Sequence, residues 1–92
     1  MAGVEVDLTD ETEKGYTFRV VVVDEDRETR HHVTLSAEDF KRLAKAGEEP
    51  EMFLERCFEF LLQREPADSI LESFGVGVIA RYFPEFEREI TA

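Results

Sequence analysis

Two stretches in the first part of the chain alternate between apolar and polar residues, which is the pattern of a β-strand with one buried face, and a third stretch between them is rich in β-branched and aromatic residues. Residues 4–8 and 28–35 alternate with a period of two, and residues 16–24 are apolar on much of both faces. A strand that is apolar on both faces is typical of the centre of a sheet. Short polar links join the stretches at residues 9–15 and 24–27. We therefore predict an antiparallel three-stranded meander with residues 16–24 in the middle.

The longest helical pattern covers residues 50–65, PEMFLERCFEFLLQRE. Pro50 suits the first position of a helix, where its missing N–H costs nothing, and Pro66 ends the pattern. At 100° per residue the apolar side chains fill an arc of about 200°. The members of this arc are Phe53, Leu54, Cys57, Phe58, Phe60, Leu61 and Leu62. A helix that lies on one sheet needs about half that width or a little more. We therefore expect this helix to contact a sheet and also a second surface, which is either more of this chain or another subunit.

A shorter helix is predicted before the long one and another after it. Ser36 is placed to cap a helix over residues 37–46 through its side-chain oxygen, and Gly47 suits the position just after the last turn. Residues 70–74 form the second short helix and contribute Leu71, among others, to the predicted core.

The C-terminal segment is less periodic. Gly75 and Gly77 break the pattern, residues 78–83 predict one or two helical turns, and residues 86–92 predict a loosely docked tail. No linker divides the chain, so we expect a single α+β domain over residues 1–92. Its predicted architecture is a three-stranded antiparallel β-meander followed by helices packed on one sheet face, in the order βββαα with short C-terminal helical turns.

The composition narrows the classes of partner. The 92-residue chain carries 22 acidic and 11 basic residues, which gives a formal net charge of −11. Nucleic-acid binding depends on Lys and Arg that neutralise phosphates, and anionic membranes attract the same residues. We therefore expect no nucleic acid and no membrane as a partner, and expect a basic protein or a second copy of this chain instead. The first residues lack the basic and apolar regions of a signal peptide, which predicts a cytoplasmic location.

His31, His32 and Cys57 are the residues to consider for catalysis or metal binding. Adjacent residues of a strand point to opposite faces, so the two histidines are poorly placed to share one metal ion. Cys57 is the single cysteine of the chain, which excludes an internal disulfide and a thiolate cluster. We expect no metal, no cofactor and no catalytic residue. A small enzyme or ligand-binding domain that uses His31, His32 and Cys57 is the alternative hypothesis.

Three groups of residues are candidates for a partner surface. Glutamates follow one margin of the long helix at spacings of four residues, and like charges at this spacing do not stabilise a helix. Aromatic residues gather around Pro84, where they either close the core or form an apolar patch. The members of these two groups are Glu51, Glu55, Glu59, Tyr82, Phe83 and Phe86. The open face of the predicted sheet is the third candidate, with Arg19, Val21, Val23, Arg30 and His32.

The C-terminal half of the chain carries a resemblance. FEFLL at residues 58–62 is followed by SILESF at residues 69–74 and VIARYFP at residues 78–84. In this combination the chain resembles small prokaryotic proteins that carry no assigned function. The resemblance implies a small domain and transfers no activity and no site.

The net charge, the wide helix face and the aromatic segment together favour one class of function. We expect a small acidic interaction module without catalytic activity, adaptor-like or antitoxin-like, that binds a basic protein or associates with itself.

Overall fold

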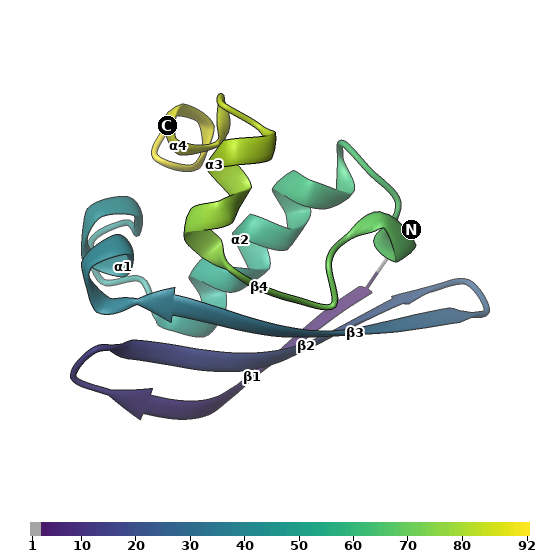
Figure 1. The fold of residues 1–92 in the computed structure, drawn as a ribbon, viewed down its shortest axis with the longest axis horizontal. Coiled ribbons are helices and arrows are strands. Elements are labelled where there is room, and N and C mark those ends of the chain that lie inside the picture. Colours follow the sequence, from purple (N-terminus) through teal and green to yellow (C-terminus); the bar gives the residue numbers. More distant parts are fainter. Residues whose placement is uncertain (1–2) are drawn as a thin grey trace.

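The computed structural model describes residues 3–92, which form one mixed sheet with helices on one side (Figure 1). The strands are β1 (Gly3–Thr12), β2 (Gly15–Asp24), β3 (Arg27–Ser36) and β4 (Ser73–Gly75), in the spatial order β1-β2-β3-β4. The first three strands pair antiparallel, and β4 pairs parallel to β3. The predicted α+β fold with an antiparallel meander is therefore confirmed, and a short fourth strand is added to it.

The helical elements all cover the same sheet face (Figure 1). They are α1 (Ala37–Leu43), α2 (Pro50–Leu62), α3 (Ile79–Tyr82) and α4 (Phe86–Ile90), with single 3₁₀ turns η1 (Ala67–Ser69) and η2 (Val76–Val78) between them. The opposite face of the sheet is not covered by any described residue.

The period-two pattern of the strands sorts their side chains between the two faces. The register places Val20 of β2 opposite Val6 of β1 and His31 of β3. Side chains in phase with Val20 point toward the helices, and in the middle of the two inner strands six of them are buried: Phe18, Val20, Val22, His31, Val33 and Leu35. The out-of-phase residues therefore form the open face.

The long helix α2 begins at Pro50 as predicted and ends at Leu62, three residues earlier than expected. Its arc contacts two surfaces. One side packs on the sheet, and on the other side Phe60 packs edge-on against Phe86 of α4, with ring centroids 5.0 Å apart. The second surface that the wide arc required is thus supplied by the C-terminal part of this same chain.

Two predicted helices differ from the structure. The helix expected over residues 37–46 ends at Leu43, because Ala44 adopts an extended conformation with φ −76° and ψ 157°. The helix expected over residues 70–74 is wrong: this segment leaves η1 and becomes β4. Residues 32–34 of β3 have main-chain groups on the outer edge that need partners, and β4 pairs with this part of the strand. Leu71, expected in the core, is 48% exposed as a result.

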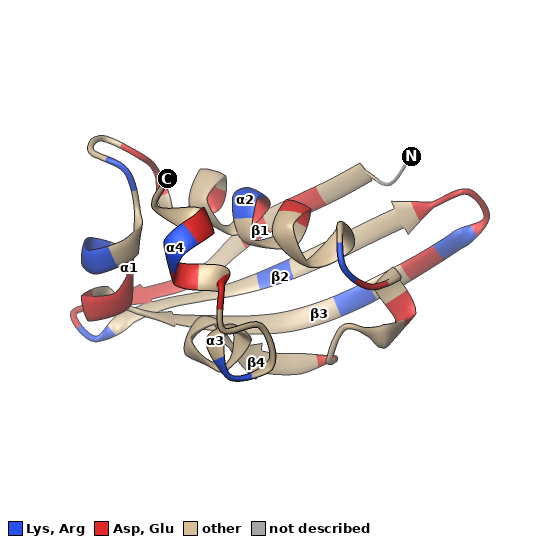
Figure 2. Cartoon of the chain, turned by 90° about the horizontal axis from the view of Figure 1, so that it is seen from above, with Lys and Arg blue, Asp and Glu red and all other residues tan. Residues whose placement is uncertain are grey.

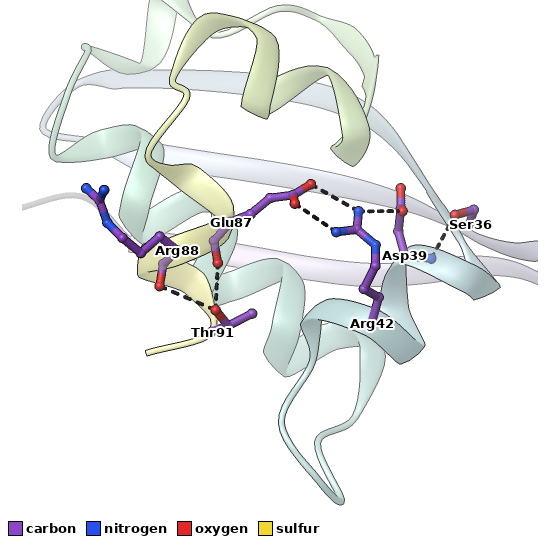
Figure 3. Close-up of polar contacts among 6 residues, drawn as sticks. All are labelled: Ser36, Asp39, Arg42, Glu87, Arg88 and Thr91. Carbon is purple, nitrogen blue, oxygen red and sulfur yellow. Dashed lines mark hydrogen bonds and ion pairs between the residues drawn. The ribbon is translucent and has the colours of Figure 1, made fainter.

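The C-terminal tail is firmly packed and does not dock loosely as expected. Phe86 and Ile90 of α4 are 1% and 4% exposed. The Arg42 guanidinium of α1 makes two hydrogen bonds to the Glu87 carboxylate, at 2.8 and 3.0 Å (Figure 3). The Arg56 guanidinium of α2 donates to the Ile90 carbonyl at 2.7 Å. Arginines from two other helices therefore anchor α4.

Candidate functional site

A groove of about 270 Å³ opens between the end of α2, β4 and α3, and it is the best candidate for a binding site. We call it the Glu65 groove. Its lining is mostly aliphatic and aromatic: Leu61, Glu65, Ser69, Ile70, Leu71, Phe74, Val78, Ile79, Tyr82 and Phe83. A concave apolar surface that contains one carboxylate is the usual composition of a binding site.

His31 does not line the groove, but it holds the segment that carries Leu71, which does. Its side chain is 3% exposed, and its ring packs on Phe58 with centroids 5.4 Å apart. Nδ1 lies 2.7 Å from the Leu71 carbonyl, which only accepts, so Nδ1 carries the proton and donates. In the neutral ring Nε2 then accepts from the Thr29 hydroxyl at 2.9 Å. The main-chain N–H of His32 donates to the Glu72 carbonyl at 2.7 Å. These bonds hold the chain at residues 71–72 so that Leu71 projects outward.

Glu65 supplies the one acidic side chain of the groove. It is half-buried, and it forms no ion pair with any residue between 3 and 92. Burial raises the pKa of the Glu65 carboxyl above its ordinary value, since the charged form loses water contacts. The neighbouring Arg64 is already engaged by Glu85 and Glu89 at 3.0 and 2.8 Å. A carboxylate in this position is stabilised by any cation that enters the groove.

Exposed apolar side chains form the rim of the Glu65 groove. Tyr82 is 67% exposed and Leu71 is 48% exposed. Among residues 3–92 only four large apolar side chains reach such exposure, and the other two, Val23 and Met52, lie outside the groove. Exposed apolar residues that gather in one place mark an interaction site more strongly than scattered ones.

The predicted aromatic group is divided between the groove and the core. Tyr82 and Phe83 line the groove. Phe86 is buried against Phe60 and takes no part in an exposed surface. The sequence did not single out Glu65 and Leu71. Glu65 belonged to the predicted last helical turn, and Leu71 was assigned to the core, so neither carried a signal for a groove.

The glutamate stripe of α2 is a solvated surface. Glu55 and Glu59 are exposed and Glu51 is half-buried, and none of the three forms an ion pair with a described residue. The helix α2 packs over β1. Outside α2, acidic residues also gather in the hairpin turns at the two ends of the sheet (Figure 2).

The five residues predicted for the open sheet face lie together on the side away from the helices. Arg19 pairs with Asp7 at 3.5 Å, and Arg30 pairs with Glu28 at 2.6 Å. All four of these side chains are at least 46% exposed, so each pair contributes about 0–1 kcal/mol. Val21 is half-buried and Val23 is 40% exposed. The charges on this face are therefore largely balanced by one another.

His31, His32 and Cys57 do not assemble into one site. His31 is in the core and His32 is on the open face. Cys57 is fully buried, and burial raises the pKa of its thiol, which keeps it protonated and unreactive. Within the described part of the chain, no three His, Cys, Asp or Glu side chains converge as a metal site requires.

No family model matches the chain, and the searches of curated proteins and of solved structures gave no match either. The resemblance of the C-terminal half to small prokaryotic proteins stays a prediction. Across residues 3–92, no helix has the length and apolar character that crossing a membrane requires.

Proposed function

We propose that this protein is a non-catalytic interaction module that captures a basic amphipathic segment of a partner protein in the Glu65 groove. The observation that carries the proposal is the half-buried Glu65 carboxylate, which has no cationic partner among residues 3–92 and lies in an apolar groove with an exposed apolar rim. The partner segment places one or two apolar side chains in the groove and a Lys or Arg against Glu65.

The size of the groove favours an anchor side chain over a free small molecule. Sites for drug-sized ligands occupy roughly 300–1,000 Å³, and the Glu65 groove has about 270 Å³. Leu71 and Tyr82 extend the apolar contact beyond the groove, as a helix or turn lying across it requires.

The charge of the protein favours a foreign partner over a second copy. Two chains that each carry a formal charge of −11 repel one another. A basic protein is attracted by the same field, which raises the rate of encounter. We therefore expect the pure protein to be a monomer by light scattering at low and at high salt.

The test uses a short synthetic amphipathic helix with leucine anchors and one lysine, at roughly physiological ionic strength. Binding is followed by titration calorimetry and by amide chemical shifts. We expect the shifts to centre on Glu65, Leu71 and Tyr82. The substitution Glu65→Gln removes the charge-assisted contact and should weaken binding about tenfold.

Matched substitutions outside the groove separate this site from general attraction to an acidic protein. Glu59→Gln removes the same charge from the solvated face of α2, and Met52→Ala removes an exposed apolar side chain elsewhere. Both should leave affinity unchanged, whereas Tyr82→Ala should reduce it. Shifts spread over the acidic surface, or an equal loss in Glu59→Gln, would show that the groove is not the site.

The pH dependence gives a second readout. The raised pKa of Glu65 means that its carboxyl takes up a proton at a higher pH than an ordinary glutamate. Binding of the lysine peptide should therefore weaken as the pH falls toward that value, and the Glu65→Gln protein should lack this part of the dependence.

A further inference from the structure

The outer edge of β1 presents unpaired main-chain groups. In an antiparallel ladder the N–H and C=O of successive residues face alternate sides of the strand. The N–H of His32 faces β4, since it donates to the Glu72 carbonyl. It follows that the main-chain N–H and C=O of His31 point toward β2. The main-chain groups of its partner Val20 then point toward β3, and those of Arg19 point toward β1. Asp7, opposite Arg19, then faces β2, and the peptide groups of Val4, Val6 and Leu8 point away from the sheet.

The usable part of this edge is short. The register of β1 shifts between Leu8 and Asp10, and such an irregularity interrupts the regular ladder and bends the strand, although pairing with β2 resumes at Asp10. Residues 3–8 remain as a straight edge. No strand within residues 3–92 covers it, because β1 is the first strand in the order β1-β2-β3-β4.

The side chains along this edge have a two-sided pattern. Val4, Val6 and Leu8 are half-buried and point toward the helix layer, beside α2. Glu5 and Asp7 are exposed on the open face, where Asp7 pairs with Arg19 at 3.5 Å and Glu5 forms no ion pair with a described residue. On the helix side, an added strand would place its own side chains beside Val4, Val6 and Leu8, so these should be apolar. On the open face its side chains would meet carboxylates.

We infer that β1 is a docking edge for an extended segment of a basic partner protein, in which Lys or Arg alternates with Val or Ile. Charge complementarity selects this occupant. A second copy of β1 would bring the same carboxylates opposite one another, and like charges directly opposite destabilise strand pairing. The carboxylates thus disfavour self-association through β1 and favour a basic strand, above all at Glu5. This site lies at the opposite edge of the sheet from β4 and the Glu65 groove.

The test uses a short peptide of alternating lysine and valine and two N-methylated isomers of it. One isomer is methylated on the valines and the other on the lysines, so charge and side chains stay the same. In a bound strand either the N–H groups of the valines or those of the lysines face β1, and the other N–H groups point away from the sheet. We expect one isomer to bind like the parent and the other to lose at least about tenfold in affinity, with the active isomer revealing the strand direction. Equal affinities of the two isomers would overturn the inference.

Hydrogen exchange locates the site in the full chain. The amides of Val4, Val6 and Leu8 should exchange rapidly in the free protein and become protected when the parent peptide binds. Glu5→Lys should reduce peptide affinity severalfold, while Glu38→Lys, the same change at an exposed residue of α1, should have a smaller effect. Glu65→Gln should have none. Unchanged exchange at all three amides, or equal losses in the two Lys variants, would mean non-specific attraction to an acidic protein.

Discussion

Arg56 joins α2 to the segment before it and to the end of α4, and its replacement by Met tests how strongly the fold depends on one partly buried cation. Its guanidinium makes two hydrogen bonds to the Glu48 carboxylate at 2.7 and 2.8 Å and a third to the Ile90 carbonyl at 2.7 Å. The Arg56 side chain is 24% exposed and that of Glu48 is 8% exposed. This contact is therefore far less solvated than an ordinary surface ion pair.

The magnitude follows from this burial. Removing one partner of a fully buried pair costs about 3–5 kcal/mol, and an exposed pair contributes about 0–1 kcal/mol. Arg56→Met leaves Glu48 nearly buried but keeps its hydrogen bond from the Lys45 amide. We expect a loss of about 2–3 kcal/mol in the free energy of unfolding. For a domain of this size that lowers Tm by roughly 10–20 °C.

The assay is urea unfolding followed by circular dichroism at several pH values. The hydrogen bonds from Arg56 lower the pKa of the Glu48 carboxyl. A lowered pKa adds stability above the unfolded value of about 4.3, and this stability is lost as the pH falls through the folded value. The difference between the wild type and Arg56→Met should therefore be largest near neutral pH and shrink in acid.

Two variants control for other effects. Arg42→Met removes an arginine that is also bidentate to a carboxylate, on Glu87, but is 48% exposed, and it should cost less (Figure 3). Arg56→Met in a Glu48→Gln background leaves no buried charge and should also cost less. A loss below about 1 kcal/mol for Arg56→Met, or equal losses at Arg56 and Arg42, would refute the argument from burial.

Three further predictions have defined outcomes. Phe86→Ala should reduce the free energy of unfolding by about 3–4 kcal/mol, because it leaves a cavity at a position that is 1% exposed. Tyr82→Ala should change this free energy little. Calorimetry measures both variants, and equal losses would mean that α4 is not packed in solution. His31→Phe keeps a ring but leaves the Leu71 carbonyl without its donor, so we expect the free energy of unfolding to fall by about 1–3 kcal/mol and peptide binding in the groove to weaken. Unchanged peptide affinity would show that His31 has no influence on the groove. The Cys57 thiol should react with a thiol reagent only at the rate of unfolding, and rapid labelling of the native protein would contradict its burial.

Local signals were sufficient where one segment determines its own structure. The alternation in residues 4–8 and 28–35, with the apolar stretch 16–24 between them, predicted the meander, since edge strands with one buried face need that period and a central strand is apolar on both faces. Pro50 predicted the start of α2 because it suits the first turn of a helix. The width of the apolar arc required a second contact surface, although the pattern left open whether this chain or another subunit supplies it.

Close approaches between distant segments had no such signal. Gly15 indicated a loop, but its backbone, with φ +152°, also lies so near β3 that a Cβ would sit 2.2 Å from the Leu35 carbonyl oxygen. Residues 70–74 have apolar spacing that fits a helix, and β4 forms there because β3 offers an unpaired edge. The Glu65 groove depends on this strand, since β4 contributes Phe74 to the lining and the segment before it leaves Leu71 exposed at the rim.

The sequence by itself determined the α+β class, the meander, the long helix and the acidic balance, because each follows from residue spacing or from a sum of charges. The tertiary structure decided which surfaces remain open. It closed the core with α4, placed His31 and His32 on opposite faces, left Glu65 in an apolar groove and left the outer edge of β1 unpaired among the described residues. These features depend on contacts between residues that are far apart along the chain, and no local pattern encodes which distant segment will cover a given face.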